Sequence, residues 1–211
     1  MQKRFLSTAV LLVASAVIVN IPAPAQTDVA LSVYGAFSGA TDANGYTQSP
    51  ANAAGGMFEL RHIANPILGF EGTYSFNRDN QNFKADPTCG VSCGNVTSAT
   101  VKADAHEVTL DWVPSVGIAN VHPFGVLGIG ALFDVPQSGS TSSQISVSTQ
   151  TVTKAVYVYG AGLDWGLVPH IGLRLQYRGN LYKTPNVTQL FTSADKFTHT
   201  AEPMIGIYFR L

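Results

Sequence analysis

The chain has 211 residues, a length that suits one domain, and only 12% of them are charged, against roughly 25% in a typical soluble domain. It contains 20 glycines and has a net charge of −1, so it lacks the basic balance of a nucleic-acid-binding protein. These values leave two all-β classes open, a membrane barrel and a secreted β-sandwich.

The first 25 residues have the pattern of a secretory signal peptide. Lys3 and Arg4 form a basic start, Phe5 to Val19 is mostly apolar and uncharged, and Ala23-Pro24-Ala25 supplies the small residues of a cleavage site. The apolar run is short for a spanning helix, and no later segment reaches a spanning length. We therefore expect cleavage after residue 25, which leaves residues 26–211 as one exported domain. An uncleaved anchor is the alternative.

Alternation of apolar residues with small or polar ones predicts eight strands in the mature chain. Successive side chains on a strand point to opposite faces, so each run has one apolar face. The predicted strands are 28–38, 56–62, 68–77, 104–113, 124–134, 156–165, 171–180 and 198–211. Glycines blur the period of the fifth strand, where we place Leu127, Ile129 and Phe133 on the apolar face.

The clearest pair of strands lies between Val156 and Asn180, around a turn at 166–169. One face of this hairpin is wholly apolar, and the other carries Gly, Asp164, Arg174 and Arg178. In a soluble sheet the apolar face would line a core. A tight barrel closed by charge pairs would instead leave the apolar face to lipid.

The connections between the predicted strands are of two kinds. Those after the second, fourth and sixth strands are short, and the four after the other strands, at 39–52, 78–100, 135–151 and 181–196, are long and polar. Outer-membrane barrels have short periplasmic turns and longer external loops. Aromatic residues form two predicted girdles at the membrane interfaces. The periplasmic girdle is Trp112, Trp165 and Phe209, and the external girdle is Phe37, Phe76, Phe133 and Tyr157.

The signal peptide, the segment YGAGLDWGLVPHIGLRLQYRGNLY and the C-terminal strand MIGIYFRL together resemble the OmpA/OmpX-type family of eight-stranded outer-membrane β-barrels. The resemblance implies an all-β, antiparallel up-and-down transmembrane barrel in the bacterial outer membrane, exported through the periplasm. It implies outer-membrane lipid, lipopolysaccharide and the barrel-assembly machinery as partners, and no cofactor. Family members usually end in an aromatic residue that this machinery reads, whereas this chain ends in Leu211.

Charged residues on the predicted inner face form the most informative candidate site. An eight-stranded barrel has an interior that side chains just fill, and buried charges must be paired. We therefore expect them to close the lumen, and a narrow selective pathway is the alternative. The predicted set is Glu59, Arg61, Glu71, Glu107, Asp111, Asp164, Arg174, Arg178, Glu202 and Arg210.

The other candidate residues carry little chemistry. Cys89 and Cys93 lie in a predicted external loop, and an exported protein would hold them as a local disulfide, with free thiols as the alternative. No zinc-binding spacing is present. Outer-membrane lipid A deacylases place a His and a Ser two residues apart, and none of the five histidines here is followed in that way by Ser or Thr. We expect neither a catalytic nor a metal site.

The sequence thus predicts a non-catalytic barrel with a structural or surface-interaction role, carried by four external loops. A small porin-like channel for solutes is the second hypothesis. A soluble lipocalin-like binding barrel would need an apolar interior and a polar exterior, and a lipid-modifying enzyme would need a catalytic set that the sequence does not display.

Overall fold

The structure, a computed structural model, describes residues 25–43, 46–85, 98–141, 150–185 and 196–211. Its strands are β1 (Gln26–Ser38), β2 (Thr41–Ala43), β3 (Tyr46–Pro50), β4 (Ala53–Ile63), β5 (Gly69–Arg78), β6 (Gln81–Ala85), β7 (Ser98–Trp112), β8 (Val121–Thr141), β9 (Val152–Val168), β10 (Ile171–Lys183) and β11 (Phe197–Arg210). Among the described residues, no helix is long and apolar enough to cross a membrane. The predicted signal peptide, apart from residue 25, lies outside this part of the chain.

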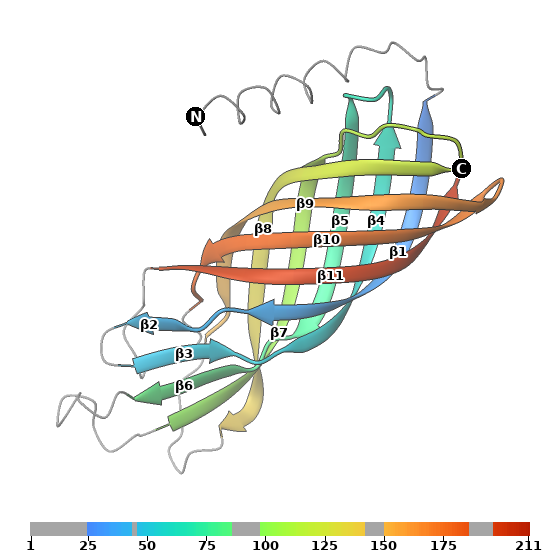
Figure 1. The fold of residues 1–211 in the computed structure, drawn as a ribbon. Coiled ribbons are helices and arrows are strands. Elements are labelled where there is room, and N and C mark those ends of the chain that lie inside the picture. The colour runs from blue at the N-terminus through green and yellow to red at the C-terminus, as the bar shows by residue number, and fades with distance from the viewer. Residues whose placement is uncertain (1–24, 44–45, 86–97, 142–149, 186–195) are drawn as a thin grey trace, which may run out of the picture.

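Eight of these strands close into an antiparallel barrel (Figure 1). Around the barrel the order is β1, β4, β5, β7, β8, β9, β10 and β11, and β11 pairs with β1. Every barrel strand is therefore hydrogen-bonded on both sides, which is how a β-structure satisfies its backbone groups in lipid. This confirms the predicted eight-stranded up-and-down barrel.

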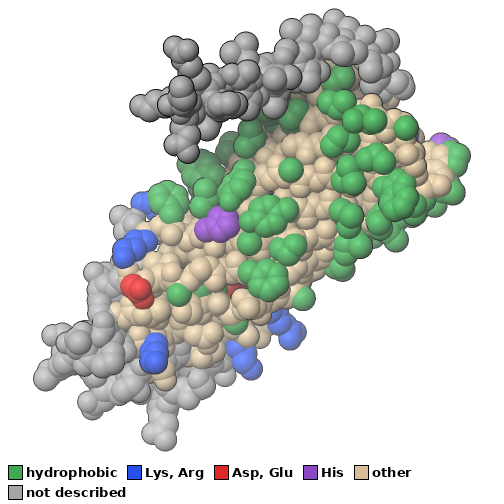
Figure 2. All heavy atoms as spheres, viewed as in Figure 1, with side chains coloured by type: hydrophobic (Ala, Val, Ile, Leu, Met, Phe, Trp, Pro, Cys, Tyr) green, Lys and Arg blue, Asp and Glu red, His purple; other side chains and the backbone are tan. Residues whose placement is uncertain are grey.

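The two faces of the barrel wall have opposite chemistry. On the outside, Leu31, Leu110 and Ile129 are 63–66% exposed, whereas Glu59 and Arg61 on the inside are fully buried. Apolar side chains cover much of the barrel surface seen in Figure 2. A soluble binding barrel would show the reverse arrangement.

The start of β1, the end of β11 and the short connections between strands all lie on one side of the molecule (Figure 1). In the connection between β4 and β5, the Asn65 side-chain Oδ1 accepts hydrogen bonds from the backbone N–H groups of Ile67 and Leu68 at 3.0 and 2.9 Å. This side chain closes a tight turn without a longer loop. By the rule of short periplasmic turns, this is the periplasmic end and the opposite end is external.

The external end carries strands where the sequence predicted only loops. β2 and β3 lie within 39–52, β6 lies within 78–100, and β7 and β8 both extend past their predicted ends. β3 pairs with β6, and β6 pairs with the start of β7. The extension is held by a buried cluster of Tyr46, Phe83 and Val101. The loop prediction was wrong here because these apolar residues are few and far apart in the sequence.

Two predicted boundaries at the periplasmic end also shift. β8 begins at Val121, inside the predicted connection 114–123, and β9 continues through Val168. Val121 pairs with Trp165, and Val168 pairs with Ile171, so neighbouring strands keep their ladder almost to the turn. The sequence predicted shorter strands here because proline and glycine lie near both positions.

Candidate functional site

Two arginines and four carboxylates close the periplasmic half of the lumen, and we call this set the lower charge cluster. Arg174 bonds Asp28 at 2.8 Å, Glu59 at 2.7 Å and Asp164 at 2.8 Å. Arg61 contacts Glu71 at 2.5 Å and Asp164 at 3.1 Å. All six side chains are at most 5% exposed. Each guanidinium therefore bridges several strands across the interior.

Strand register explains part of this cluster. Arg61 lies directly opposite Glu71 on β5, and Arg174 lies directly opposite Asp164 on β9. The Arg174–Glu59 contact instead crosses the lumen between strands that are not neighbours. Such a contact depends on the closed, narrow barrel rather than on any one hairpin.

The Phe124 ring completes this closure from β8. The Arg61 guanidinium carbon lies 4.0 Å from the ring centroid, and that of Arg174 lies 5.6 Å from it. The Tyr208 ring lies 5.6 Å from the same Arg174 carbon. Both aromatic residues are at most 5% exposed. Cations above aromatic faces are attracted by the ring quadrupole, so these rings stabilise a dense layer across the barrel.

A second cluster lies further toward the external end, around Arg178. Its Nη2 atom is 3.4 Å from Glu107 and 3.6 Å from Asp111. The Asn180 Nδ2 group donates to both carboxylate oxygens of Glu107, at 3.3 and 3.0 Å. Arg178 also lies 3.3 Å from the Thr73 hydroxyl. This side chain is fully buried, so hydrogen bonds as well as charges hold it.

The structure places nine of the ten predicted charged residues inside the barrel as buried side chains. Arg210 differs, because it lies half-buried at the periplasmic end. Glu202 is buried on β11 directly opposite Arg178. Yet within the described residues neither Glu202 nor Arg210 forms an ion pair.

Sequence reasoning missed several interior residues. Asp28 shares the inner face with Ala30, and the alternation of β1 was a signal that could have found it. Phe124 and Asp134 belong to the strand whose glycines blur the period. Asp79 follows the end of β5 and is 8% exposed. No local pattern pointed to its burial, which depends on the external extension.

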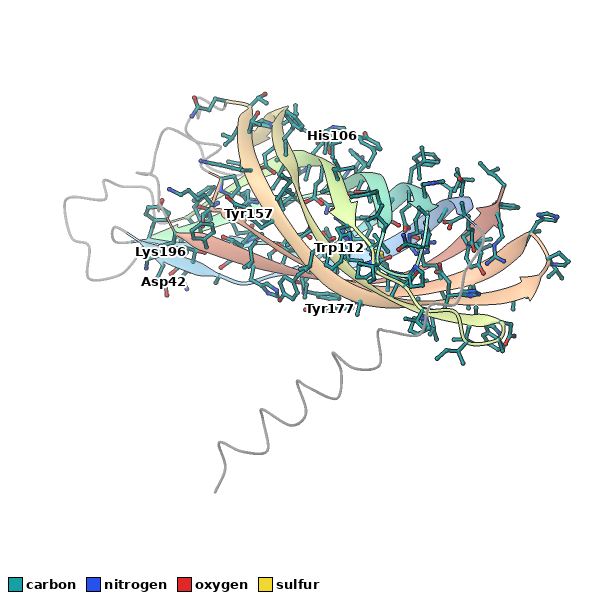
Figure 3. All side chains as sticks on the ribbon, turned by 90° about the horizontal axis from the view of Figure 1, so that it is seen from above. Asp42, His106, Trp112, Tyr157, Tyr177 and Lys196 are labelled. Carbon is teal, nitrogen blue, oxygen red and sulfur yellow. The ribbon has the colours of Figure 1, made fainter. Side chains whose placement is uncertain are left out.

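The predicted aromatic girdle residues all lie on the outer surface. Their exposed fractions range from 37% to 54%. Trp112 lies near the periplasmic end of β7, whereas Tyr157 lies toward the external end of β9, and both are labelled in Figure 3. Their role as interfacial anchors stays a prediction.

The histidines described on the outer surface have simple partners. His106 Nδ1 lies 2.9 Å from the Tyr74 hydroxyl, and His199 Nε2 lies 2.8 Å from the Tyr159 hydroxyl. Across the described ranges, no three His, Cys, Asp or Glu side chains are arranged to hold a metal ion. Cys89 and Cys93 fall outside these ranges, so the disulfide stays a prediction.

Exposed basic residues gather at the external end, around the extension (Figure 2). They are Arg78, Lys84, Lys102, Lys183 and Lys196. The Lys196 ammonium donates to the backbone carbonyl of Asp42, and Figure 3 shows the two residues together beside β2. In the same region, burial raises the pKa of Asp79 to about 6, although a hydrogen bond from Gln81 opposes this shift.

Residues 9–201 match the model of the family described as "Outer membrane protein beta-barrel domain". The chain belongs to this family. The match covers most of the chain, and with the closed apolar-faced barrel it places the protein in the bacterial outer membrane. No curated protein matches the chain.

Solved structures of outer-membrane barrels share the fold of this family member at low sequence identity. Ail of Yersinia pestis has 17% identity and a TM-score of 0.50, covering 90% of this chain and 100% of its own. OprG of Pseudomonas aeruginosa has 12% identity and a TM-score of 0.53, with coverages of 89% and 96%. Neisserial surface protein A has 14% identity and a TM-score of 0.51, with coverages of 90% and 100%.

Proposed function

We propose that this protein is a non-catalytic, closed outer-membrane barrel whose external end binds phosphate groups of lipopolysaccharide. The observation that carries the proposal is the distribution of exposed cations. Arg78, Lys84, Lys102 and Lys183 are exposed near the external ends of β5, β6, β7 and β10, and Lys196 precedes β11. At the periplasmic end of the described chain no Lys or Arg is exposed: Arg61 and Arg174 are buried inside the barrel, and Arg210 is half-buried.

The position of these cations relative to the apolar surface supports a lipid partner. On β7 the outward face changes from Leu110 and Val108, both exposed, through His106 and Asp104, which lies 4.0 Å from Arg78, to exposed Lys102. On β10 it changes from exposed Leu175 and Tyr177 to Lys183. Lysines just beyond an apolar band meet lipid headgroups, and each contributes about 1 kcal/mol near an anionic surface. The external headgroups of an outer membrane are those of lipopolysaccharide.

The structural part of the proposal is supported by the lower charge cluster and the Phe124 ring, which together fill the periplasmic half of the interior. The non-catalytic part is supported by the surface position of His106 and His199, each paired with a tyrosine. A small porin-like channel is the runner-up, and a conductance measurement separates it from a closed barrel.

Binding to lipopolysaccharide tests the proposal. The variant Lys102→Gln/Lys183→Gln should bind lipopolysaccharide-containing vesicles several-fold more weakly than the parent protein, and rising salt should reduce the difference. Arg210→Gln, at the opposite end, is the matched control and should bind normally. Equal binding by all three proteins would contradict the proposal.

A competition experiment tests which kind of anionic ligand the external end binds. The Ail structure is a complex with the heparin analogue sucrose octasulfate, so a sulfated saccharide is an informative competitor. Displacement of lipopolysaccharide by sucrose octasulfate would show that the basic surface recognises polyanions in general. Binding of the saccharide without any binding of lipopolysaccharide would overturn the lipid assignment.

A further inference from the structure

Beyond this function, we propose that the external half of the lumen binds one small hard cation of the Na⁺, K⁺ or Ca²⁺ kind between Glu202, Asn180 and Asn77. A cavity lies above the lower charge cluster, between β1, β5, β7, β10 and β11. It leaves about 20 Å³ for the centres of water-sized molecules, enough for roughly one water or ion. Its lining includes Glu107, Glu202, Asn77, Asn180 and Asp79.

The first argument is the charge balance of the interior. The described residues include nine buried carboxylates but only three buried arginines. The lower charge cluster uses Arg61 and Arg174, and Arg178 is shared between Glu107 and Asp111. A buried carboxylate without a compensating charge is costly in an interior of low dielectric constant. Half-buried Lys154 adds one positive charge near Asp134, and the external half of the lumen still has a surplus of negative charge.

Glu202 shows this surplus most directly. It is 4% exposed, it lines the cavity, and its Oε2 atom has no hydrogen-bond partner. Arg178 lies opposite it in the β10–β11 ladder. The Arg178 guanidinium is nevertheless directed at Glu107, Asp111 and two threonine hydroxyls. Glu202 thus lines the cavity and shares the charge of Arg178 with Glu107 and Asp111, and its Oε2 atom is left without a partner.

Two amide groups present further oxygens to the same cavity. The Asn180 Nδ2 group is occupied by Glu107, and the Asn77 Nδ2 group donates to the Tyr34 hydroxyl at 3.2 Å. An ionised carboxylate only accepts hydrogen bonds, so Glu107 fixes the direction of the Asn180 amide, and the unpartnered atoms of the two amides are Asn180 Oδ1 and Asn77 Oδ1. Three oxygens that only accept hydrogen bonds therefore line one small cavity.

The chemistry of these atoms selects the ligand class. Hard cations prefer carboxylate and amide oxygens. A water molecule satisfies two such oxygens through its hydrogens but adds no positive charge beside Glu202, which shares Arg178 with Glu107 and Asp111.

The test uses the mature protein folded in zwitterionic phosphatidylcholine vesicles, where no lipid phosphomonoester competes for the ion. Urea unfolding is followed by gel mobility at equal ionic strength in NaCl, KCl, CaCl₂ or choline chloride, because choline is too large for the cavity. Above its Kd, each tenfold rise in the bound cation should raise the folding equilibrium constant about tenfold. Choline should have no such effect.

Variants make the test specific. Glu202→Gln should abolish the cation dependence and should raise stability in choline, a result that loss of a merely structural contact would not produce. Asn77→Ala keeps the carboxylate and should raise the required cation concentration several-fold. Asp104→Asn, on the outer surface, is the matched control and should keep the full response.

Three results would overturn the inference. One is equal stability in all four salts, and another is a cation response that survives in Glu202→Gln. The third is a stability of Asp79→Asn that changes with pH but does not respond to any of the cations, which would show that protons neutralise the surplus charge. A response to any one of the three small cations, lost in Glu202→Gln, supports it.

Discussion

At the scale of single residues, Arg174 has the largest predicted effect on stability. Its guanidinium contacts Asp28, Glu59 and Asp164, and all of these groups are buried. Arg174→Ala would leave these carboxylates without their principal cation, and removal of one partner from a buried ion pair costs about 3–5 kcal/mol. We expect a loss of that order in urea unfolding from bilayers.

Arg174→Lys provides the comparison for this prediction. Lysine restores the charge but not the planar fork that contacts three carboxylates at once. Its stability should lie between those of the parent and Arg174→Ala. An Arg174→Ala protein as stable as the parent would show that the cluster is dispensable for folding.

A second residue-scale prediction concerns the narrowness of the interior at Gly162. A Cβ atom there would collide with the Phe124 ring and would lie 2.8 Å from the Leu175 carbonyl oxygen. Gly162→Ala should therefore displace Phe124 from Arg61 and cost about 1–3 kcal/mol, as overpacking does. Gly72→Ala is the matched control, since no atom lies within 4 Å of its Cβ position. Equal melting temperatures for the two variants would contradict the prediction.

At the scale of the strand, the β9–β10 hairpin tests which face meets lipid. Leu163 and Leu173 lie on the outer face, whereas Gln176 is buried on the inner face. An arginine on the lipid face costs about 2–4 kcal/mol near the midplane and less toward the interfaces. Leu163→Arg should therefore impair folding into bilayers, and Leu173→Arg, which lies opposite Trp165 of the periplasmic girdle, should do so to a smaller extent. Gln176→Arg should be better tolerated, because the interior has an excess of carboxylates. Heat-modifiable gel mobility measures the folded fraction, and the reverse order would mean that the faces are assigned backwards.

The external extension has its own testable pH dependence through Asp79. Burial raises the pKa of this group to about 6, so between pH 4 and pH 6 the folded state holds a proton that the unfolded chain has released. Its contribution to stability is therefore present at low pH and is lost as the pH rises through 6. Asp79→Asn should remove this dependence and stabilise the protein above pH 6 by roughly 2–3 kcal/mol.

The exposed Asp42, also in the extension, provides the control for this experiment. Asp42→Asn keeps Asp79 unchanged and should therefore keep the pH dependence that Asp79 produces. Urea midpoints of the three proteins between pH 4 and pH 8 give the comparison. A parallel pH profile for Asp79→Asn and the parent would refute the assignment.

At the scale of the whole molecule, the layer formed by Arg61, Arg174 and Phe124 predicts a barrel that does not conduct. The parent protein should show no steady ionic current in a planar lipid bilayer. Arg174→Ala/Phe124→Ala, which removes a cation and a ring from the same layer, should admit water and give measurable current. A stable current through the parent protein would instead favour the porin-like alternative.

Most of the barrel could be predicted from the sequence, because alternation is a local property of a strand. It identified eight strands, their outward faces and nine buried charged residues without any knowledge of neighbours. It also implied the burial of Asp28, which was overlooked. Alternation failed where its signal weakened, at the glycines of β8, whose inner side chain Phe124 packs against Arg61.

Only the tertiary structure decided which charges meet and where the interior is left with a surplus. Arg178 and Glu202 are opposite each other in the ladder, yet Arg178 is directed at Glu107 and Asp111. The sequence could not specify this, because a long side chain in a narrow barrel reaches several strands and its partner depends on closure and register. The sequence could not specify the external strands for the same reason. Tyr46, Phe83 and Val101 form a core only after β3, β6 and β7 are brought together.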